Sequence, residues 1–242
     1  MHQDEAAGPG GRTVVVTGGT SGIGAAIARR FAADGDEVVA AGLDADRCAG
    51  ELPTGVRAVE LDVTRADALG AFLDGLGGLD VLVNAAGVIA RGREYEPDVF
   101  ADVVSVNLTG TMRSCVAARK ALADTGGCIV NVASMLSYFG GPKVPAYSSS
   151  KGGVMQLTKS LAVAWADQGI RVNAVAPGWI RTPLTQSLQE DPENSRRIID
   201  RTPMGRWGTP AEIAGAVAFL AGPDAGFITG AVLAVDGGYL AA

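Results

Sequence analysis

Short apolar runs alternate with longer amphipathic segments along almost the whole chain. Short runs rich in β-branched residues are typical of strands that are buried on both faces of a sheet. We expect strands at residues 12–17, 37–41, 56–61, 79–84, 128–133, 171–176 and 232–235, and helices at 22–33, 66–76, 99–124, 148–167 and 211–220. This alternation predicts one α/β domain with a doubly wound parallel sheet that helices cover on both faces.

Two stretches depart from the alternation. Residues 1–11 are polar or small, and we expect them to form a flexible lead-in before a domain at 12–242. Residues 177–209 are rich in Pro, Thr and Arg and show no clear period. A loop of this length in a compact domain usually carries function. We therefore expect residues 177–209 to form a lid over a substrate.

The composition excludes several classes of protein. The only histidine is His2, which argues against serine–histidine hydrolysis and against histidine-bound zinc. A net charge of -6 argues against a nucleic-acid partner, and no apolar run approaches the roughly 18–20 residues of a membrane helix. Cys48, Cys115 and Cys128 show no CxxC spacing and fit reduced thiols. We expect a cytoplasmic protein that acts on a small molecule and uses no metal.

A glycine-rich turn follows the first expected strand and opens the first expected helix. Glycine permits a tight turn and a close approach of the backbone, and a helix N-terminus offers free N–H groups to a phosphate. The spacing is Gly-x3-Gly-x-Gly rather than GxGxxG, and in this position it predicts a dinucleotide site. The candidate contacts are Gly18, Thr20, Ser21, Gly22, Ile23 and Gly24.

Ser134, Tyr147 and Lys151 form a second candidate cluster. Tyr147 and Lys151 are four residues apart, so both project from one face of a helix. A free tyrosine has a pKa of about 10; an adjacent ammonium and a cationic nicotinamide would lower this pKa and make the phenol a useful acid/base. Ser134 follows an expected strand, where open α/β sheets bind ligands, and its hydroxyl could hold a substrate oxygen. Taken alone, the Tyr-x3-Lys pair could be a surface tyrosine beside a solvated lysine.

These motifs resemble those of the short-chain dehydrogenase/reductase family in order and spacing. The resemblance rests on Thr17-Gly18, Gly22-Ile23-Gly24, Asn84-Ala85-Ala86-Gly87, Asn107, Ser134, Tyr147-x3-Lys151 and Pro177-Gly178. It implies a Rossmann-type sheet of seven strands, a homotetramer or homodimer, and hydride transfer between a nicotinamide and a hydroxyl or carbonyl carbon. It also implies that Tyr147 is the acid/base, that Lys151 lowers the pKa of Tyr147, and that Ser134 orients the substrate. Asn107 would support a proton-relay water beside Lys151.

The resemblance also implies single cofactor contacts. The adenine contact corresponds to Asp62 and Val63. The segment beside the adenosine corresponds to Asn84, Ala85, Ala86 and Gly87. The nicotinamide wall and amide contact correspond to Pro177, Gly178, Ile180 and Thr182. At each position the alternative is ordinary turn or strand-end chemistry.

The end of the second strand bears on the choice between NAD and NADP. The acidic residue that usually binds the ribose hydroxyls in this family aligns with Gly42, and Asp44 follows two positions later. The places of a phosphate-binding cation hold Ser21, Gly42 and Leu43, and the nearest arginine is Arg47. We therefore expect NAD(H) to be favoured over NADP(H), with Asp44 as a contact. Alternatively, Asp44 caps a short helix.

Residues 133–141 read Ala-Ser-Met-Leu-Ser-Tyr-Phe-Gly-Gly. They are similar to the active-site loop of sugar-acid dehydrogenases of the gluconate 5-dehydrogenase and 2-dehydro-3-deoxy-gluconate 5-dehydrogenase type, which implies a substrate such as a 5-keto-gluconate. A sugar acid needs a cation for its carboxylate. Arg91, Arg93 and Arg181 are candidates, and Met135 is a candidate pocket residue. Each arginine could equally be solvated.

Two other functions stay open. An apolar lid could instead close over a 3-oxoacyl thioester, as in an acyl-carrier-protein reductase, and its candidate residues are Met135, Leu136, Trp179, Leu184 and Leu188. The non-enzyme alternative is a dinucleotide-binding sensor. Such proteins usually have a damaged catalytic set, whereas all four catalytic candidates are present here.

Overall fold

Seven parallel strands form one sheet at the centre of the computed structural model, which describes residues 11–48, 50 and 52–242. In spatial order the strands are β3 (Val56–Glu60), β2 (Glu37–Gly42), β1 (Thr13–Thr17), β4 (Val81–Asn84), β5 (Cys128–Val132), β6 (Arg171–Pro177) and β7 (Val232–Val235). The prediction of a doubly wound, seven-stranded parallel α/β fold is confirmed. The expected lead-in lies, except for Gly11, outside the described residues.

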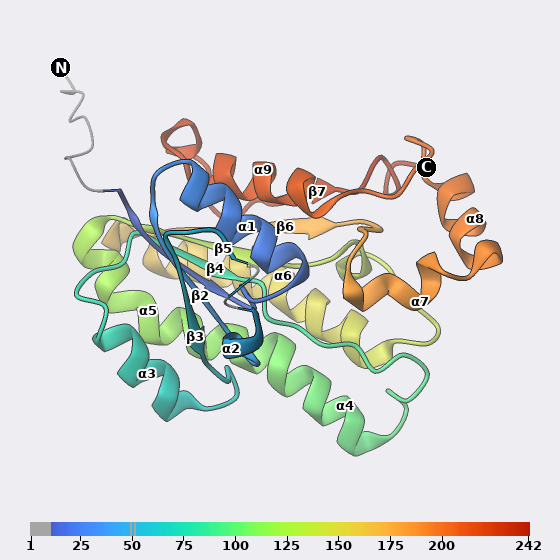
Figure 1. Ribbon diagram of the computed structural model, residues 1–242, viewed down its shortest axis with the longest axis horizontal. Coiled ribbons are helices and arrows are strands. Elements are labelled where there is room, and N and C mark those ends of the chain that lie inside the picture. Colours follow the sequence, from blue (N-terminus) through green and yellow to red (C-terminus); the bar gives the residue numbers. More distant parts are fainter. Residues whose placement is uncertain (1–10, 49, 51) are drawn as a thin grey trace.

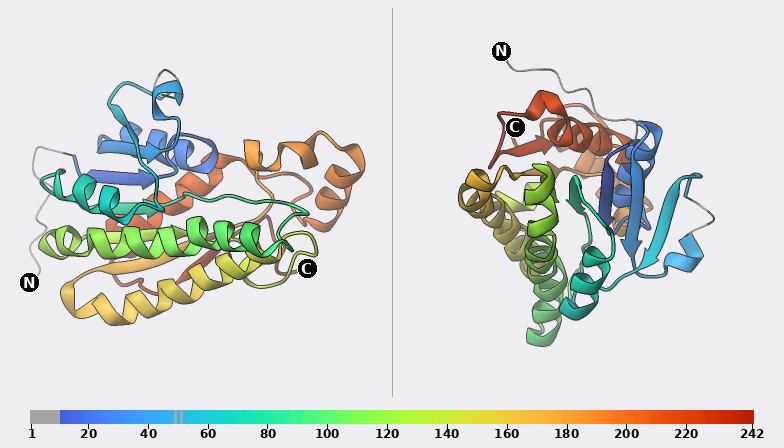
Figure 2. Two further views of the ribbon diagram at one scale, coloured as in Figure 1. Left: turned by 90° about the horizontal axis from the view of Figure 1, so that it is seen from below. Right: turned by 90° about the vertical axis from the view of Figure 1, so that its left-hand side faces the viewer.

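Helices cover both faces of the sheet (Figure 1). One face carries α1 (Gly22–Ala33) and α9 (Pro210–Ala221), which pack against each other. The other face carries α3 (Ala66–Asp74), α5 (Thr111–Thr125) and α6 (Pro145–Trp165). Figure 2 shows α5 and α6 running along the sheet from two further directions.

The two faces have separate cores because successive side chains of a strand point in opposite directions. Val14 and Val16 of β1 belong to the core with α1 and α9, whereas Val15 belongs to the core with α5 and α6. All three valines are fully buried. The unbroken apolar runs in the sequence are explained by this burial on both sides of the sheet.

The expected helix at 99–124 is a composite. It consists of α4 (Pro97–Val104), a π-helical segment η2 (Ser105–Gly110) and α5, joined without a break. A π-helical turn inserts extra backbone into a helix and often marks a functional site. Hydropathy alone does not reveal it, because the apolar face continues through the insertion. The candidate Asn107 lies within η2.

The expected helix at 148–167 begins earlier than predicted. The structure starts α6 at Pro145, which places Tyr147 inside the first turn, and a 3-10 turn η4 (Ala166–Gln168) follows its end. Proline at the first helical position is well tolerated, since its missing N–H has no partner there in any case.

The stretch at 177–209 is more regular than expected. It contains η5 (Pro183–Thr185), α7 (Gln186–Gln189) and α8 (Pro192–Arg201), which extend beyond one end of the sheet (Figure 1). These helices are short and polar, so they show little apolar periodicity. The remaining short helices are α2 (Ala45–Cys48), η3 (Met135–Ser137) and η6 (Pro223–Ala225). In the described part of the chain, no helix is long and apolar enough to cross a membrane.

Candidate active site

A cleft of about 250 Å³ lies beyond the carboxyl ends of β1, β4 and β5. Open α/β sheets bind ligands at this edge. The cleft is lined by Gly18, Ser21, Gly22, Ile23, Gly24, Ala85, Ala86, Gly87, Val132, Tyr147, Lys151, Thr182, Pro183 and Leu184. The structure thus brings the glycine turn, the segment after β4 and the Tyr147–Lys151 pair to one place.

Glycine is required at several points of this cleft. Gly18 has a φ of 68°, and a Cβ on it would lie 2.6 Å from the amide nitrogen of Ala86. A Cβ on Gly24 would overlap the carbonyl oxygen of Gly18. Gly87 is not required in this way, because a Cβ on it would make only ordinary van der Waals contact, 3.5 Å from Nζ of Lys151. The bare backbone therefore leaves an open path from the N-terminus of α1 to Lys151, which fits an elongated dinucleotide.

The residues on the side predicted to hold the adenosine have mixed roles. A Cβ at Gly42 would lie 2.8 Å from Oγ1 of Thr20, so Thr20 occupies the space of the usual acidic residue. Asp44 is exposed and has a φ of 55°, in the left-handed region. The alternative role predicted for Asp44 was to cap a short helix. The N–H of Ala45, which begins α2, donates instead to Glu60 at 2.9 Å, so Glu60 supplies this cap.

Asp62 and Val63 have structural partners. One carboxylate oxygen of Asp62 accepts hydrogen bonds from the N–H and the hydroxyl of Thr64, both at 2.8 Å. These bonds lower the pKa of Asp62. Val63 is buried against Gly110. The turn expected as the alternative role of Asp62 is therefore present, and its role as an adenine contact stays a prediction.

Asn84 faces the protein interior. Its Nδ2 donates to Oδ1 of Asn131 at 2.9 Å and to the sulfur of Cys115 at 3.3 Å. Asn131 in turn donates to Thr158 of α6 at 2.9 Å. The side chain of Asn84 therefore ties β4 to β5 and α6, while Ala85, Ala86 and Gly87 line the cleft.

The expected nicotinamide wall divides into buried and cleft-lining residues. Pro177 and Ile180 are buried, and a Cβ on Gly178 would lie 2.7 Å from the Cα of Asp236. Thr182 lines the cleft opposite Gly22, whose Cβ would lie 3.7 Å from that of Thr182. Pro183 also lines the cleft and was not singled out from the sequence, whereas Leu184, a candidate for an apolar lid, lines this cleft and not the larger cavity described below.

Lys151 is a buried cation. Only 4% of it is exposed, and its Nζ donates to the carbonyl oxygen of Val132 at 2.7 Å. Burial disfavours the charged form and lowers the pKa of Lys151 to about 8. The Nζ of Lys151 therefore lies at the carboxyl end of β5, within the cleft.

Tyr147 lies beside this lysine, and Nζ of Lys151 is 5.7 Å from the centre of the tyrosine ring. Burial raises the pKa of Tyr147, while a hydrogen bond with the Ser134 side chain and the charge of Arg91 oppose that rise, and the charge of Glu94 adds to it. The expected lowering of this pKa by Lys151 is therefore not found in the protein alone. The ammonium is engaged by the carbonyl of Val132, and burial of the phenol dominates.

Asn107 is fully buried and hydrogen-bonded. Its Oδ1 accepts the N–H of Val88 at 2.8 Å, and its Nδ2 donates to Val88 O at 3.0 Å and to Ser150 Oγ at 3.1 Å. Its carbonyl accepts the hydroxyl of Thr111 at 2.8 Å. Asn107 thus joins the segment after β4 to α6 and borders the same point of the cleft as Lys151.

A larger cavity of about 870 Å³ lies beside α7 and α8, in the stretch 177–209 that we expect to form a lid. It is lined by Arg91, Leu136, Phe139, Gly140, Gly141, Pro142, Lys143, Val144, Trp179, Leu188, Asn194, Arg197, Ile198, Asp200, Arg201 and Tyr239. Arg91 lines this cavity, and its charge lowers the pKa of Tyr147, which lines the neighbouring cleft. This position fits a substrate site.

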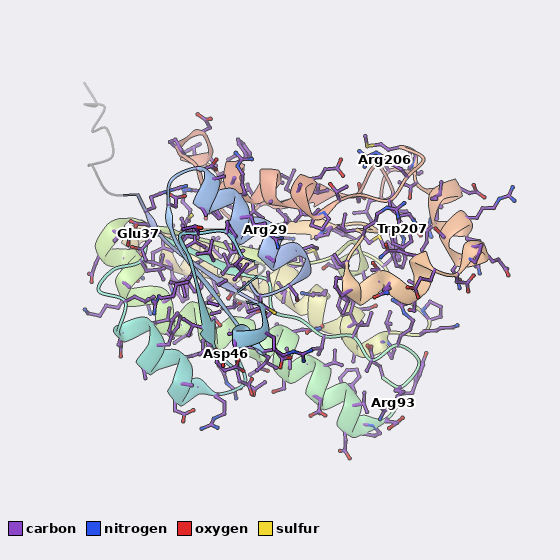
Figure 3. All side chains as sticks on the ribbon, viewed as in Figure 1. Arg29, Glu37, Asp46, Arg93, Arg206 and Trp207 are labelled. Carbon is purple, nitrogen blue, oxygen red and sulfur yellow. The ribbon has the colours of Figure 1, made fainter. Side chains whose placement is uncertain are left out.

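The structure places the predicted substrate contacts at different distances from this cavity's lining. Arg91 lines the cavity, whereas Arg93 pairs with Glu96 and points outward beside α4 (Figure 3). Arg181 is exposed and is not among the lining residues, and Met135 is buried behind Leu136, which does line the cavity. The cations of α8, Arg197 and Arg201, were missed because their approach to the cavity depends on how the lid folds.

Known proteins match this chain over nearly its whole length. A family model described as enoyl-(acyl carrier protein) reductase matches residues 18–240. The chain is 42% identical to galactitol 2-dehydrogenase (L-tagatose-forming) of Cereibacter sphaeroides, covering 95% of each chain. It is 39% identical to 2-dehydro-3-deoxy-D-gluconate 5-dehydrogenase of Escherichia coli, covering 96% of each.

The chain belongs to the short-chain dehydrogenase/reductase family. A solved structure of a provisionally named 2-deoxy-D-gluconate 3-dehydrogenase from Agrobacterium tumefaciens, with bound NADP, superimposes with a TM-score of 0.89. It is 41% identical, and the match covers 97% of this chain and 98% of that one. This short-chain dehydrogenase/reductase is therefore an oxidoreductase that acts on CH–OH groups with a nicotinamide dinucleotide as cofactor.

The glycine cradle predicts the effect of a single methyl group. Gly24→Ala would collide with the Gly18 carbonyl, and we expect NADH or NADPH to bind at least about 10-fold more weakly in a fluorescence titration. Gly70→Ala in α3 is the matched control, because nothing lies near its Cβ. Unchanged binding in Gly24→Ala would contradict the proposed cradle.

The buried lysine predicts a pH-dependent stability. Since the pKa of Lys151 is lowered from 10.5 to about 8, the unfolded state binds the extra proton between these values, and wild-type stability rises with pH there. Lys151→Met lacks this rise. In urea titrations its free energy of unfolding, relative to that of wild type, should therefore fall by roughly 2–3 kcal/mol between pH 7 and 10. Lys159→Met, at an exposed site, should stay within about 0.5 kcal/mol of wild type. A constant difference for Lys151→Met would contradict the lowered pKa.

Proposed function

We propose that this enzyme transfers a hydride between its nicotinamide cofactor and a secondary alcohol or ketone of a sugar acid, such as a 5-keto-gluconate-type compound. The observation that carries this proposal is the charge of the lid cavity. Four cations, Arg91, Lys143, Arg197 and Arg201, face it with one carboxylate, Asp200. The whole chain has a net charge of -6, so this local excess of positive charge is specific to the cavity. A carboxylate is the substrate group that such a site would recognise.

Three of these cations are available to a ligand. Within the described part of the chain, none of Arg91, Lys143 and Arg197 makes an ion pair, and the two arginines offer the paired donors that a carboxylate prefers. Arg201 lies over the ring of Tyr239 at 4.3 Å and over that of Phe139 at 5.5 Å. Arg91 and Arg197 therefore support the proposal most directly, one from the segment after β4 and the other from α8.

The catalytic roles proposed for the cleft follow from its geometry. When bound, the cofactor supplies the hydride acceptor or donor. Tyr147 exchanges a proton with the substrate oxygen, and Ser134, which hydrogen-bonds to Tyr147, holds the same oxygen. Because its pKa is raised, Tyr147 keeps its proton at neutral pH and is suited to protonate a ketone oxygen during reduction. Lys151 and Asn107, which both lie beside Gly87, would position the cofactor and return the proton.

The cofactor preference and the assembly state are part of the same proposal. NAD(H) is favoured because Asp44 is exposed just beyond β2, where a carboxylate would repel a 2′-phosphate. A homotetramer or homodimer is supported by apolar residues exposed on α5 and α6, including Val163, which is 84% exposed. Cys115 and Cys128 are buried free thiols, which suits a cytoplasmic protein.

Two other activities have observations in their favour. The relative that forms L-tagatose acts on galactitol, so a neutral polyol is a second candidate substrate. A 3-oxoacyl thioester is a third, because Leu136, Trp179 and Leu188 give the cavity an apolar side. A sensor without catalysis is disfavoured by the intact set of Asn107, Ser134, Tyr147 and Lys151 in the cleft.

Tyr147→Phe tests the reaction class. Loss of the hydroxyl removes the acid/base, so kcat should fall by roughly 10²–10⁴-fold while the cofactor still binds. The measurement is initial-rate kinetics with a parallel NADH titration, and Tyr138→Phe, at an exposed site, is the control. A sensor or a different catalyst would retain its activity in Tyr147→Phe.

Arg91→Ala and Arg197→Ala test the substrate class. Each should raise KM for the sugar acid about 10- to 100-fold, because a charge-assisted hydrogen bond is lost, and should leave KM for galactitol nearly unchanged. Arg93→Ala is the matched control, since Arg93 pairs with Glu96 away from the cavity. Equal effects on acidic and neutral substrates would contradict recognition of a carboxylate.

A further inference from the structure

Glu94 is a buried carboxylate that the sequence did not single out. Only 1% of it is exposed, and it lies in the segment that follows β4. Its Oε1 accepts the N–H of Ala90 at 2.9 Å, and its Oε2 accepts the N–H of Tyr147 at 2.8 Å. A buried carboxylate is costly unless its oxygens are hydrogen-bonded, and here both are. Ala90 precedes Arg91 in the chain, and Tyr147 itself carries the phenol. Glu94 therefore binds the backbone next to both groups that the proposed function needs.

We propose that Glu94 is a positioning residue that holds the anion-binding Arg91 and the acid/base Tyr147 at a fixed spacing and places a negative charge near the phenol. This inference rests on the proposed function. The carboxylate spans the gap between two segments that the sheet alone does not join, the segment after β4 and the first turn of α6.

The backbone around Arg91 is held on both sides. Glu94 binds the N–H of Ala90, and the N–H of Gly92 donates to the carbonyl of Lys143 at 2.8 Å. The hydroxyl of Tyr95 donates to the carbonyl of Pro142 at 2.8 Å. Three hydrogen bonds from residues 92–95 therefore reach the stretch that leads into α6 and its first turn. These bonds fix the Arg91 segment to the start of α6.

Glu94 also provides the cap that α6 lacks. The residue before this helix, Val144, makes no side-chain cap hydrogen bond, and the first turn contains no acidic residue. The first N–H groups of a helix have no partner inside it, and a negative charge near them is favourable. Glu94 meets this need from outside the helix, on the N–H of Tyr147 itself.

The charge of Glu94 affects the chemistry of the phenol. Tyr147 faces three charged groups, Arg91 and Glu94 from the segment after β4 and Lys151 from α6. A negative charge disfavours the phenolate, and Glu94 accordingly raises the pKa of Tyr147. Glu94 thus helps to keep the proton that Tyr147 donates to a ketone.

Two substitutions separate the effect of the charge of Glu94 from the effect of its side-chain length. Glu94→Gln removes the charge, so the pKa of Tyr147 in the pH profile of kcat/KM should fall. Glu94→Asp keeps the charge but shortens the side chain by one methylene, so the carboxylate can no longer bind both N–H groups. We expect its pH profile to match wild type and its kcat to fall about 10- to 100-fold. Glu96→Gln, at an exposed site beside Arg93, is the matched control and should behave as wild type.

A second readout does not depend on turnover. Ionisation of Tyr147 is measured by absorbance at ~295 nm, as the difference between each protein and its Tyr147→Phe counterpart, with folding checked by circular dichroism. The titration should shift to lower pH in Glu94→Gln and stay in place in Glu94→Asp. Wild-type rates and an unshifted titration in both variants would overturn the role of Glu94, as would an equal shift in both. If Tyr147→Phe retains full activity, the proposed function fails instead, and the titration still decides the effect of the charge.

Discussion

A buried row of polar side chains holds the sheet and the catalytic helix together. Thr17, Asn84 and Asn131 are partners in the parallel register of β1, β4 and β5, at the carboxyl ends of these strands. Their side chains are hydrogen-bonded in sequence, and Asn131 reaches Thr158 of α6. Buried polar groups are costly unless each finds a partner, so this row tolerates little change in register. It brings the glycine turn after β1 and the Tyr147–Lys151 face of α6 to the same cleft.

The charges of the site are arranged around a buried lysine. Lys151 has a carbonyl rather than a carboxylate as its hydrogen-bond partner, and its charge is therefore not neutralised by Val132. A nearby ligand with negative groups would compensate this charge, which is consistent with a dinucleotide in the cleft. The phenol of Tyr147 keeps its proton under the combined effect of burial and Glu94, opposed by Ser134 and Arg91. This protonation state supports the proposed donation of a proton to a carbonyl oxygen.

Much of the fold and part of the site could be predicted from the sequence because they depend on local patterns. Unbroken apolar runs such as Val14-Val15-Val16 indicate strands buried on both faces, and the glycines after β1 indicate a turn that a side chain would block. The other features depend on tertiary structure. Glu94 meets Tyr147 across 53 positions of sequence, and α8 turns Arg197 toward a cavity that exists only once the lid is folded. The raised pKa of Tyr147 likewise follows from burial, which a spacing of four residues does not reveal.

The most direct test is a matrix of initial rates. NAD(H) and NADP(H) are each combined with gluconate, 5-keto-gluconate and the 2-dehydro-3-deoxy acid, with galactitol as a neutral polyol, and with an acetoacetyl thioester. We predict turnover of at least one sugar acid, with NAD(H) preferred. Turnover of the thioester with NADPH and none of any sugar acid would contradict both the substrate and the cofactor proposed here, while leaving the family and the role of Tyr147 in place.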